Sequence, residues 1–144
     1  MKILILNGPN LNLLGKREPG IYGTGSYDDL CMELVAYAAA RDIRVDIRQS
    51  NHEGVLIDEI QAADGVYDGI VINPGAYTHY SYAIYDALLA VSVPAIEVHL
   101  SNINRRESFR RISVTAPACR AQIVGHGFLG YMAVSYTHLR AHET

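Results

Sequence analysis

Residues 3–15, ILILNGPNLNLLG, place a four-residue apolar run directly before a long polar loop. A buried strand that ends in such a loop is where an open α/β sheet keeps its ligand site. Phosphate-binding loops need successive backbone N–H groups and several glycines, but here Pro9 removes one donor and the leucines Leu11, Leu13 and Leu14 add apolar bulk. We therefore expect this loop to bind an uncharged or carboxylate-bearing small molecule rather than a nucleotide.

Similar apolar runs recur along the chain, and the segments between most of them have helical spacing. The five runs are residues 3–6, 45–47, 69–72, 95–98 and 121–124. Strands that alternate with helices indicate a parallel sheet with helices on both faces. For five strands we expect a flavodoxin-like three-layer α/β sandwich with strand order 2-1-3-4-5, which puts ligands at the carboxyl ends of strands 1, 3 and 4.

Three of the connecting segments have an apolar helical face. Residues 26–29, Ser-Tyr-Asp-Asp, are typical of a capping box and predict a helix that runs to about Arg41. We predict that the third helix begins at His79, directly after the turn at residues 73–75. The inner faces of the three helices are expected to be Leu30, Leu34 and Ala38; Leu56, Ile57, Ile60 and Ala63; and Ile84, Leu88 and Val91.

The composition limits the class of protein. A chain of 144 residues, 49% hydrophobic, suits one domain, and a net charge of −3 gives no footprint for nucleic acid or an anionic membrane. The first residues form a strand rather than a signal peptide, and no apolar run approaches the roughly 18 residues of a membrane span, so we expect a cytoplasmic protein. Cys31 and Cys119 lie far apart, and the histidines stand alone, so we expect no disulfide and no metal site.

The last eleven residues need a separate interpretation. Residues 134–144, VSYTHLRAHET, resemble one reading frame of a widely used transposase sequencing adapter. We therefore expect a single catalytic domain at residues 1–133, with its final helix truncated, followed by a non-native tail. His138 and His142 in that tail carry no functional argument.

Glu97 and His99 are the pair with the clearest chemistry. Residues two apart on a strand face the same side, so these two side chains point together while Val98 faces the other way. A carboxylate beside an imidazole fixes its tautomer and favours its protonated form, which suits a general acid. A hydrogen-bonded histidine at a strand end, with no catalytic role, is the alternative interpretation.

Other polar residues follow the same strand ends or lie in the first loop. Asn73 and His79 follow strand 3, and Ser101 follows strand 4, where a hydroxyl and loop amides could hold a substrate carboxylate. Arg17 beside Tyr22 would stabilise a phenolate. Lowering a tyrosine pKa from about 10 to near 7 requires roughly 4 kcal/mol, so the loop would have to close over the site. Turn, cap or solvated roles remain the alternatives for all of these residues.

Six motifs in a fixed order resemble type II 3-dehydroquinate dehydratase from Lys2 to about Ala133. Each motif alone is weak, but the six together are highly specific. They are residues 7–15 (NGPNLNLLG), residues 17–19 (REP) with Tyr22-Gly23, residues 48–51 (RQSN), residues 73–79 (NPGAYTH), residues 97–102 (EVHLSN) and residues 109–111 (FRR).

The resemblance implies the reversible dehydration of 3-dehydroquinate to 3-dehydroshikimate in the shikimate pathway, by anti elimination through an enolate and without a metal or organic cofactor. Tyr22 matches the general base at C2, and Arg17 matches the residue that lowers its pKa. His99, oriented by Glu97, matches the acid that protonates the leaving hydroxyl, and Asn10 helps to position a water that stabilises the enolate. The matching substrate-binding positions are Asn73, His79, Leu100, Ser101 and Arg110, with Asp86 reached from a neighbouring subunit. Members of the family assemble as dodecamers built from trimers, so the resemblance implies self-association.

Other functions fit the residues less well. A lysine Schiff base is another route to this dehydration, but the chain has only Lys2 and Lys16. A receiver-like signalling domain needs acidic residues after strands 1 and 3, where this chain has Asn7-Gly8 and Asn73. A flavin-binding module needs a Ser/Thr/Gly phosphate loop. An inactive, truncated dehydratase is the remaining alternative.

Overall fold

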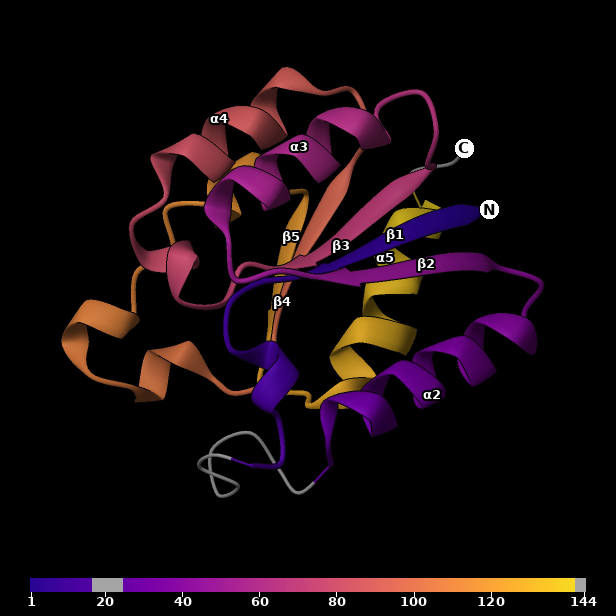
Figure 1. Cartoon of the computed structure of the whole chain (residues 1–144), viewed down its shortest axis with the longest axis horizontal. Coiled ribbons are helices and arrows are strands. Elements are labelled where there is room, and N and C mark those ends of the chain that lie inside the picture. Colours follow the sequence, from indigo (N-terminus) through magenta and orange to yellow (C-terminus); the bar gives the residue numbers. More distant parts are fainter. Residues whose placement is uncertain (17–24, 142–144) are drawn as a thin grey trace.

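A five-stranded parallel sheet forms the centre of the protein (Figure 1). The structure, a computed structural model, describes residues 1–16 and 25–141. The strand order is β2-β1-β3-β4-β5, which confirms the predicted flavodoxin-like topology. The strands are β1 (Lys2–Asn7), β2 (Arg44–Gln49), β3 (Gly69–Asn73), β4 (Ala95–His99) and β5 (Ala121–Val124).

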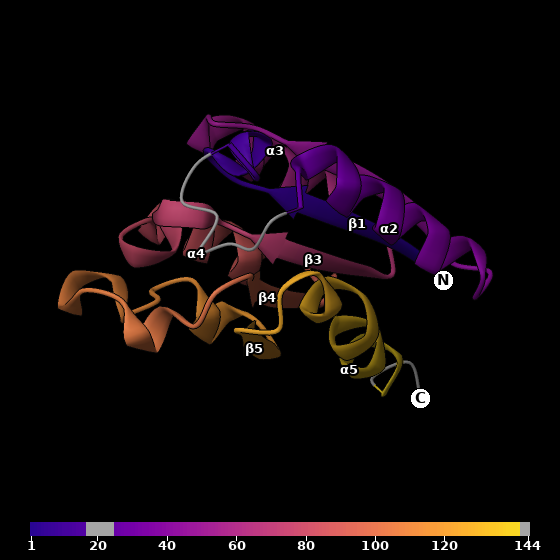
Figure 2. The same cartoon turned by 90° about the horizontal axis from the view of Figure 1, so that it is seen from below.

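Helices cover both faces of the sheet, as predicted. Helices α3 (Glu53–Ala63) and α4 (Tyr82–Ala90) lie on one face, and α2 (Tyr27–Ala39) and α5 (Ser135–Ala141) lie on the other (Figure 1). On that second face α2 packs along β2 and α5 packs along β4 (Figure 2). The sheet is thus the middle layer of a three-layer sandwich.

Strand β1 supplies side chains to two separate hydrophobic cores because successive residues of a strand face opposite sides. Ile3 and Ile5 pack with the residues of α2 and the C-terminal helix, whereas Leu4 and Leu6 pack with those of α3 and α4. The predicted inner faces of the helices are buried at Leu30, Leu34, Ala38, Leu56, Ile60, Ala63, Ile84 and Leu88.

The predicted capping box at the start of α2 is present. The Ser26 hydroxyl accepts from the Asp29 N–H at 3.1 Å, and the Asp29 carboxylate accepts from the Ser26 N–H at 3.1 Å. These two bonds satisfy N–H groups that have no partner inside the helix. The helix therefore begins where the sequence indicates, and it ends at Ala39.

The predicted start of the third helix at His79 is wrong. His79 is the last residue of a 3₁₀ helix, η2 (Gly75–His79), and α4 begins three residues later at Tyr82. The reason is the cap: Ser81 accepts from the Ile84 N–H at 3.0 Å, which sets the first turn of α4. Val91 is the extended residue that ends this helix, and it packs, partly buried, against the core on the expected side.

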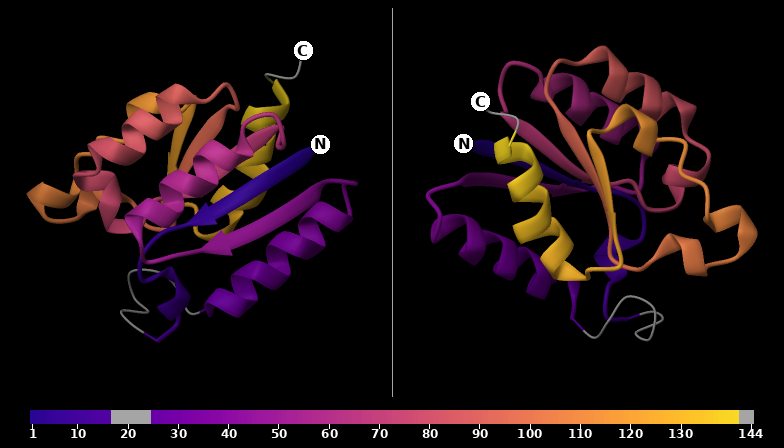
Figure 3. Two further views of the ribbon diagram at one scale, coloured as in Figure 1. Left: turned by 45° about the horizontal axis from the view of Figure 1, so that its top comes forward. Right: turned by 180° about the vertical axis from the view of Figure 1, so that it is seen from behind.

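The connection between β4 and β5 replaces a crossover helix with three short turns, the last of which packs against α4 (Figure 3). They are η3 (Ile103–Arg105), η4 (Ser108–Arg110) and η5 (Ala116–Ala118). After β5, a π-helical segment, η6 (Gly130–Val134), continues directly into α5. Among the described residues, no helix combines the length and the apolar character needed to cross a membrane.

Candidate active site

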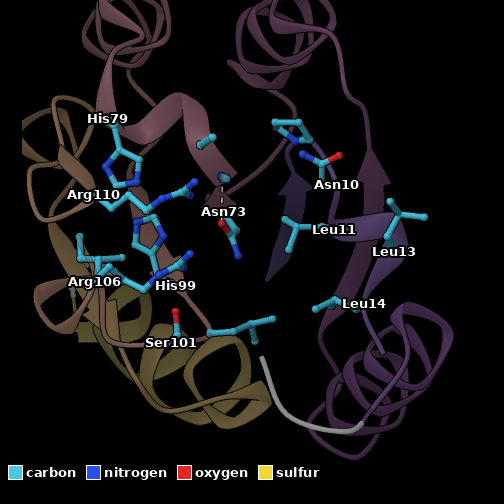
Figure 4. A pocket seen from close by; sticks show the side chains of 15 residues that line it. Asn10, Leu11, Leu13, Leu14, Asn73, His79, His99, Ser101, Arg106 and Arg110 are labelled. Carbon is cyan, nitrogen blue, oxygen red and sulfur yellow. Dashed lines mark hydrogen bonds between the residues drawn. The ribbon is translucent and has the colours of Figure 1, made fainter. Parts of the chain in front are cut away.

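A cavity of about 180 Å³ opens at the carboxyl ends of β1, β3 and β4, where the strand order predicts a ligand site (Figure 4). It lies between the loop after β1 and the segments that follow β3 and β4. Its lining residues are Pro9, Asn10, Leu11, Leu13, Leu14, Asn73, Gly75, Ala76, His79, His99, Leu100, Ser101, Ile103, Arg106 and Arg110.

Two glycines let the loops after β1 and β3 lie against each other at the floor of this cavity. A Cβ on Gly8 would lie 2.5 Å from the carbonyl oxygen of Pro74, which is too close for any side chain. Gly75 has a φ of +61°, and a Cβ there would lie 3.0 Å from the Pro9 carbonyl oxygen. The close packing of the two backbones therefore requires glycine at both positions.

Asn10 is held in a left-handed conformation, with a φ of 69°. Asparagine tolerates this region better than most residues other than glycine. Its N–H donates to Asn51 Oδ1 at 3.1 Å, and Gln49 Nε2 donates to the same oxygen at 3.1 Å and to the Gly8 carbonyl at 3.1 Å. The last residue of β2 and the residues after it thus fix the root of the first loop, a role that the sequence analysis did not assign to them.

His99 and Glu97 form the predicted pair. His99 Nε2 lies 2.9 Å from Glu97 Oε2, and both side chains are almost fully buried. The pair lies at the end of β4, where His99 lines the cavity and Glu97 lies behind it. A carboxylate can only accept, so Nε2 carries the hydrogen and the other ring nitrogen, Nδ1, is left for a ligand.

The carboxylate of Glu97 is surrounded by four side-chain donors from three other segments. The Ser113 hydroxyl and Gln122 Nε2 each donate to Oε2 at 2.8 Å, and the Thr78 hydroxyl donates to it at 3.1 Å. The Thr115 hydroxyl donates to the other oxygen, Oε1. These donors hold a buried negative charge directly behind His99.

The pKa of Glu97 reflects two opposing effects. Burial alone raises the pKa of a carboxyl, but the hydrogen bond and positive charge of His99, with hydrogen bonds from Thr115 and Gln122, lower it below its ordinary value. Glu97 is therefore ionised at neutral pH. It can orient the imidazole and stabilise its protonated form.

His79 faces the cavity from the end of η2. Its Nδ1 lies 2.7 Å from the carbonyl oxygen of Ile112, which can only accept, so Nδ1 carries a hydrogen. Nε2 is the nitrogen left to meet a ligand. A backbone carbonyl of the β4–β5 connection thereby sets the tautomer of a residue that follows β3.

The two walls of the cavity differ in character. In Figure 4, His79, His99, Arg106 and Arg110 gather on one side, and the leucines of the first loop face them from the other. Arg110 Nε lies 3.1 Å from Glu107 Oε2. None of the lining residues in the described part of the chain is acidic, so the cavity suits a small anionic ligand with one apolar surface.

The structure brings together most of the residues that the sequence singled out. Seven of them line the cavity: Asn10, Asn73, His79, His99, Leu100, Ser101 and Arg110. Glu97 lies behind His99, and Asp86 is exposed on α4 and does not line the cavity. Arg17 and Tyr22 lie outside the described residues. The sequence analysis missed Arg106, for which the only signal was its place in a pair of arginines after β4.

No group of three or more His, Cys, Asp or Glu side chains lies close enough to hold a metal ion in residues 1–16 and 25–141. Cys31 and Cys119 are free thiols. Burial raises the pKa of both. Neither thiol is therefore activated as a nucleophile.

The protein is a flavodoxin-like sandwich with a buried carboxylate–imidazole pair beside a cavity at the carboxyl ends of its strands. This is the arrangement of an α/β enzyme that acts on a small anionic molecule. A family model described as "Dehydroquinase class II" matches residues 1–138. The chain belongs to this family.

Similar proteins carry consistent names. The 3-dehydroquinate dehydratase of Halalkalibacterium halodurans is 59% identical over 90% of this chain and 89% of that protein, and the one of Clostridium acetobutylicum is 58% identical over 92% of each. Among solved structures, type II dehydroquinase from Butyrivibrio crossotus matches with a TM-score of 0.94 and 56% identity, covering 97% of both chains. Type II dehydroquinase from Propionibacterium acnes has a TM-score of 0.91 and 42% identity over 96% of both chains.

Proposed function

We propose that this protein catalyses the reversible dehydration of 3-dehydroquinate to 3-dehydroshikimate, a step of the shikimate pathway. Membership of the class II dehydroquinase family supports this reaction. The observation that carries it is the Glu97–His99 pair, 2.9 Å apart and buried at the end of β4, facing a cavity with a basic wall. The substrate carries a carboxylate, which such a wall attracts.

The elimination needs a base and an acid on opposite sides of the substrate. The base removes the proton at C2, and the electron pair moves onto the carbonyl oxygen to form an enolate. The enolate then expels the hydroxyl group, which takes a proton from the acid and leaves as water. We assign the acid to His99, because its Nδ1 is free to face a ligand while Glu97 stabilises the charged ring.

We assign the base to Tyr22 and its activation to Arg17, both on the first loop. Lowering a tyrosine pKa from about 10 to near 7 takes roughly 4 kcal/mol, so Arg17 must act in a site that excludes water. Asn10, at the root of this loop, is assigned to the water that stabilises the enolate. Its backbone is held by Asn51 at 3.1 Å, which supports a fixed position for its side chain.

Five further residues are assigned to substrate binding. They are Asn73, His79, Leu100, Ser101 and Arg110, all of which line the cavity. Arg110 and His79 suit hydroxyl or carboxylate oxygens, and the backbone at Leu100 and Ser101 suits a carboxylate. These groups explain recognition and acid–base chemistry without a metal or organic cofactor, so we propose that none is required.

We further propose that the protein works in the cytoplasm as a homododecamer built from trimers, in which Asp86 reaches the cavity of a neighbouring subunit. The exposure of Asp86 on α4 supports this role. So does the apolar surface at Tyr80, Tyr82, Phe109 and Ile112, each at least 59% exposed in the single chain. We also propose that the domain proper ends at residue 133 and that residues 134–144 are appended sequence.

The reaction produces a conjugated enone, so ultraviolet absorbance follows it directly. Purified protein with 3-dehydroquinate is expected to show rising absorbance, with the same rate after treatment with EDTA. A folded protein that gives no signal in either case would refute the activity. Activity that is lost only with EDTA would refute the cofactor-free reaction while leaving the activity in place.

A further inference from the structure

A chain of buried hydrogen bonds runs from helix α2 to the floor of the cavity. Asn7 Nδ2 donates to the Tyr27 hydroxyl at 3.3 Å, the Tyr131 hydroxyl donates to Asn7 Oδ1 at 2.7 Å, and Asn73 Nδ2 donates to the Tyr131 hydroxyl at 2.9 Å. Asn7, Asn73 and Tyr131 are at most 3% exposed. None of these bonds joins residues that are close in sequence.

The direction of every bond in this chain follows from one backbone group. The Gly75 N–H lies 3.0 Å from the Asn73 side chain and can only donate, so the Asn73 carboxamide must turn its oxygen toward it. Its NH₂ group then faces Tyr131, whose hydroxyl accepts there and gives its own hydrogen to Asn7. Burial raises the pKa of Tyr131, so this hydroxyl keeps its hydrogen across the working pH range.

Asn73 is the point where this network meets the ligand. The residue ends β3 and lines the cavity. One N–H of its side-chain NH₂ group donates a hydrogen bond to the Tyr131 hydroxyl. The second hydrogen is fixed in direction because the amide is held at both its oxygen and its nitrogen. A carboxamide held in this way offers one N–H donor whose orientation needs no adjustment when an oxygen-bearing ligand binds.

We propose that Tyr131 is a positioning residue, which fixes the Asn73 carboxamide so that its remaining N–H donates to an oxygen of the bound substrate. The inference rests on the proposed function and extends it to a residue of the C-terminal helical segment. Tyr131 reaches Asn73 from the face of the sheet that α2 and α5 cover. A residue of η6 thus shapes the substrate site through Asn73 without touching the ligand.

Tyr131→Phe tests this inference because it removes the hydroxyl and keeps the ring. Asn73 then loses the partner that holds its nitrogen, and we expect KM for 3-dehydroquinate to rise about tenfold, as for the loss of one well-directed hydrogen bond. The Asn73 contact is present in both ground and transition states, so kcat is expected to stay within about twofold. Tyr27→Phe is the matched control: it removes a hydroxyl at the other end of the chain of bonds and is expected to leave KM unchanged.

A double-mutant cycle distinguishes positioning from a general structural effect. If Tyr131 acts through Asn73, then Tyr131→Phe has no further effect on KM in an Asn73→Ala background. An unchanged KM in Tyr131→Phe, or an increase of the same size in both backgrounds, would overturn the inference. An inactive wild type would refute the proposed function and this inference with it, whereas an active wild type with an unchanged variant refutes the inference alone.

A crystal structure of the wild-type protein with 3-dehydroshikimate bound gives an answer even if the variant does not fold. We expect Asn73 to keep its bonds to Gly75 and Tyr131 and to place its second N–H on a ligand oxygen. A ligand that does not contact Asn73, or an amide turned away from Tyr131, would show that the inference is wrong.

Discussion

Thr115→Val is expected to destabilise the protein because it removes a hydrogen bond to the buried carboxylate of Glu97. Valine has the shape of threonine, so the substitution removes a hydroxyl and leaves the packing nearly intact. Thr115 is fully buried, and among the described residues its hydroxyl is the one donor recorded to Glu97 Oε1. A hydrogen bond to a charged group contributes about 1.5–3 kcal/mol, so we expect the free energy of unfolding at pH 7 to fall by about that amount.

Thr78→Val is the matched control for this substitution. Thr78 is also fully buried, but it donates to Glu97 Oε2, which also receives hydrogen bonds from Ser113, Gln122 and His99. The remaining donors keep that oxygen satisfied, so we expect a loss of only about 1 kcal/mol. Urea unfolding of the two variants and the wild type measures the difference.

The same experiment has a defined pH dependence. The pKa of Glu97 in the folded protein is below its ordinary value of 4.5, so its contribution to stability is fully present above pH 4.5 and is lost as the pH falls through the folded-state pKa. Thr115→Val raises that folded-state pKa. The gap in stability between wild type and variant should therefore be constant above about pH 5 and shrink at lower pH. A gap that persists at low pH, or a larger loss in Thr78→Val, would refute the reasoning.

Three further predictions concern the loops and the C-terminal helix. Gly8→Ala places a Cβ 2.5 Å from a backbone oxygen, so we expect a loss of about 1–3 kcal/mol in thermal or urea unfolding; an unchanged midpoint would show that the two loops can separate freely. Tyr22→Phe should abolish turnover while product binding stays measurable by calorimetry, and full activity would rule out this base. Leu139→Ala should cost about 2–4 kcal/mol, because Leu139 is 3% exposed and packs on Gly69, and a neutral result would show that α5 is not docked.

Features set by local spacing could be predicted from the sequence. The two-residue period of a strand put Glu97 and His99 on one side, and the structure joins them at 2.9 Å. The alternation of apolar runs with helical segments indicated a parallel sheet, and the flavodoxin-like strand order expected for five strands placed the ligand site at the edge where the cavity lies. The capping box at Ser26 is likewise a short-range pattern, readable from four residues.

Features set by contacts between distant residues could not be predicted in this way. Tyr131 and Asn7 are 124 positions apart, and no local pattern links them. Gln122 reaches Glu97 because β5 pairs with β4 in this register, and Thr115 reaches it because the β4–β5 connection folds back against β4. The roles of Arg17 and Tyr22 stay predictions, because both lie outside the described residues.

The two hydrophobic cores become complete at different times while the chain is being made. The core under α3 and α4 draws its buried residues from positions 4–95, whereas the core under α2 and the C-terminal helix extends from Ile3 to Leu139. Chains fold as they leave the ribosome, N-terminal parts first. One side of the sheet can therefore close before β5 has emerged, while the other still needs Ile123 and Tyr131 from the C-terminal part of the chain. Until then Ile3, Ile5 and Val71 on that side of the sheet remain exposed to solvent. This apolar surface is the part of the unfinished chain most prone to aggregate.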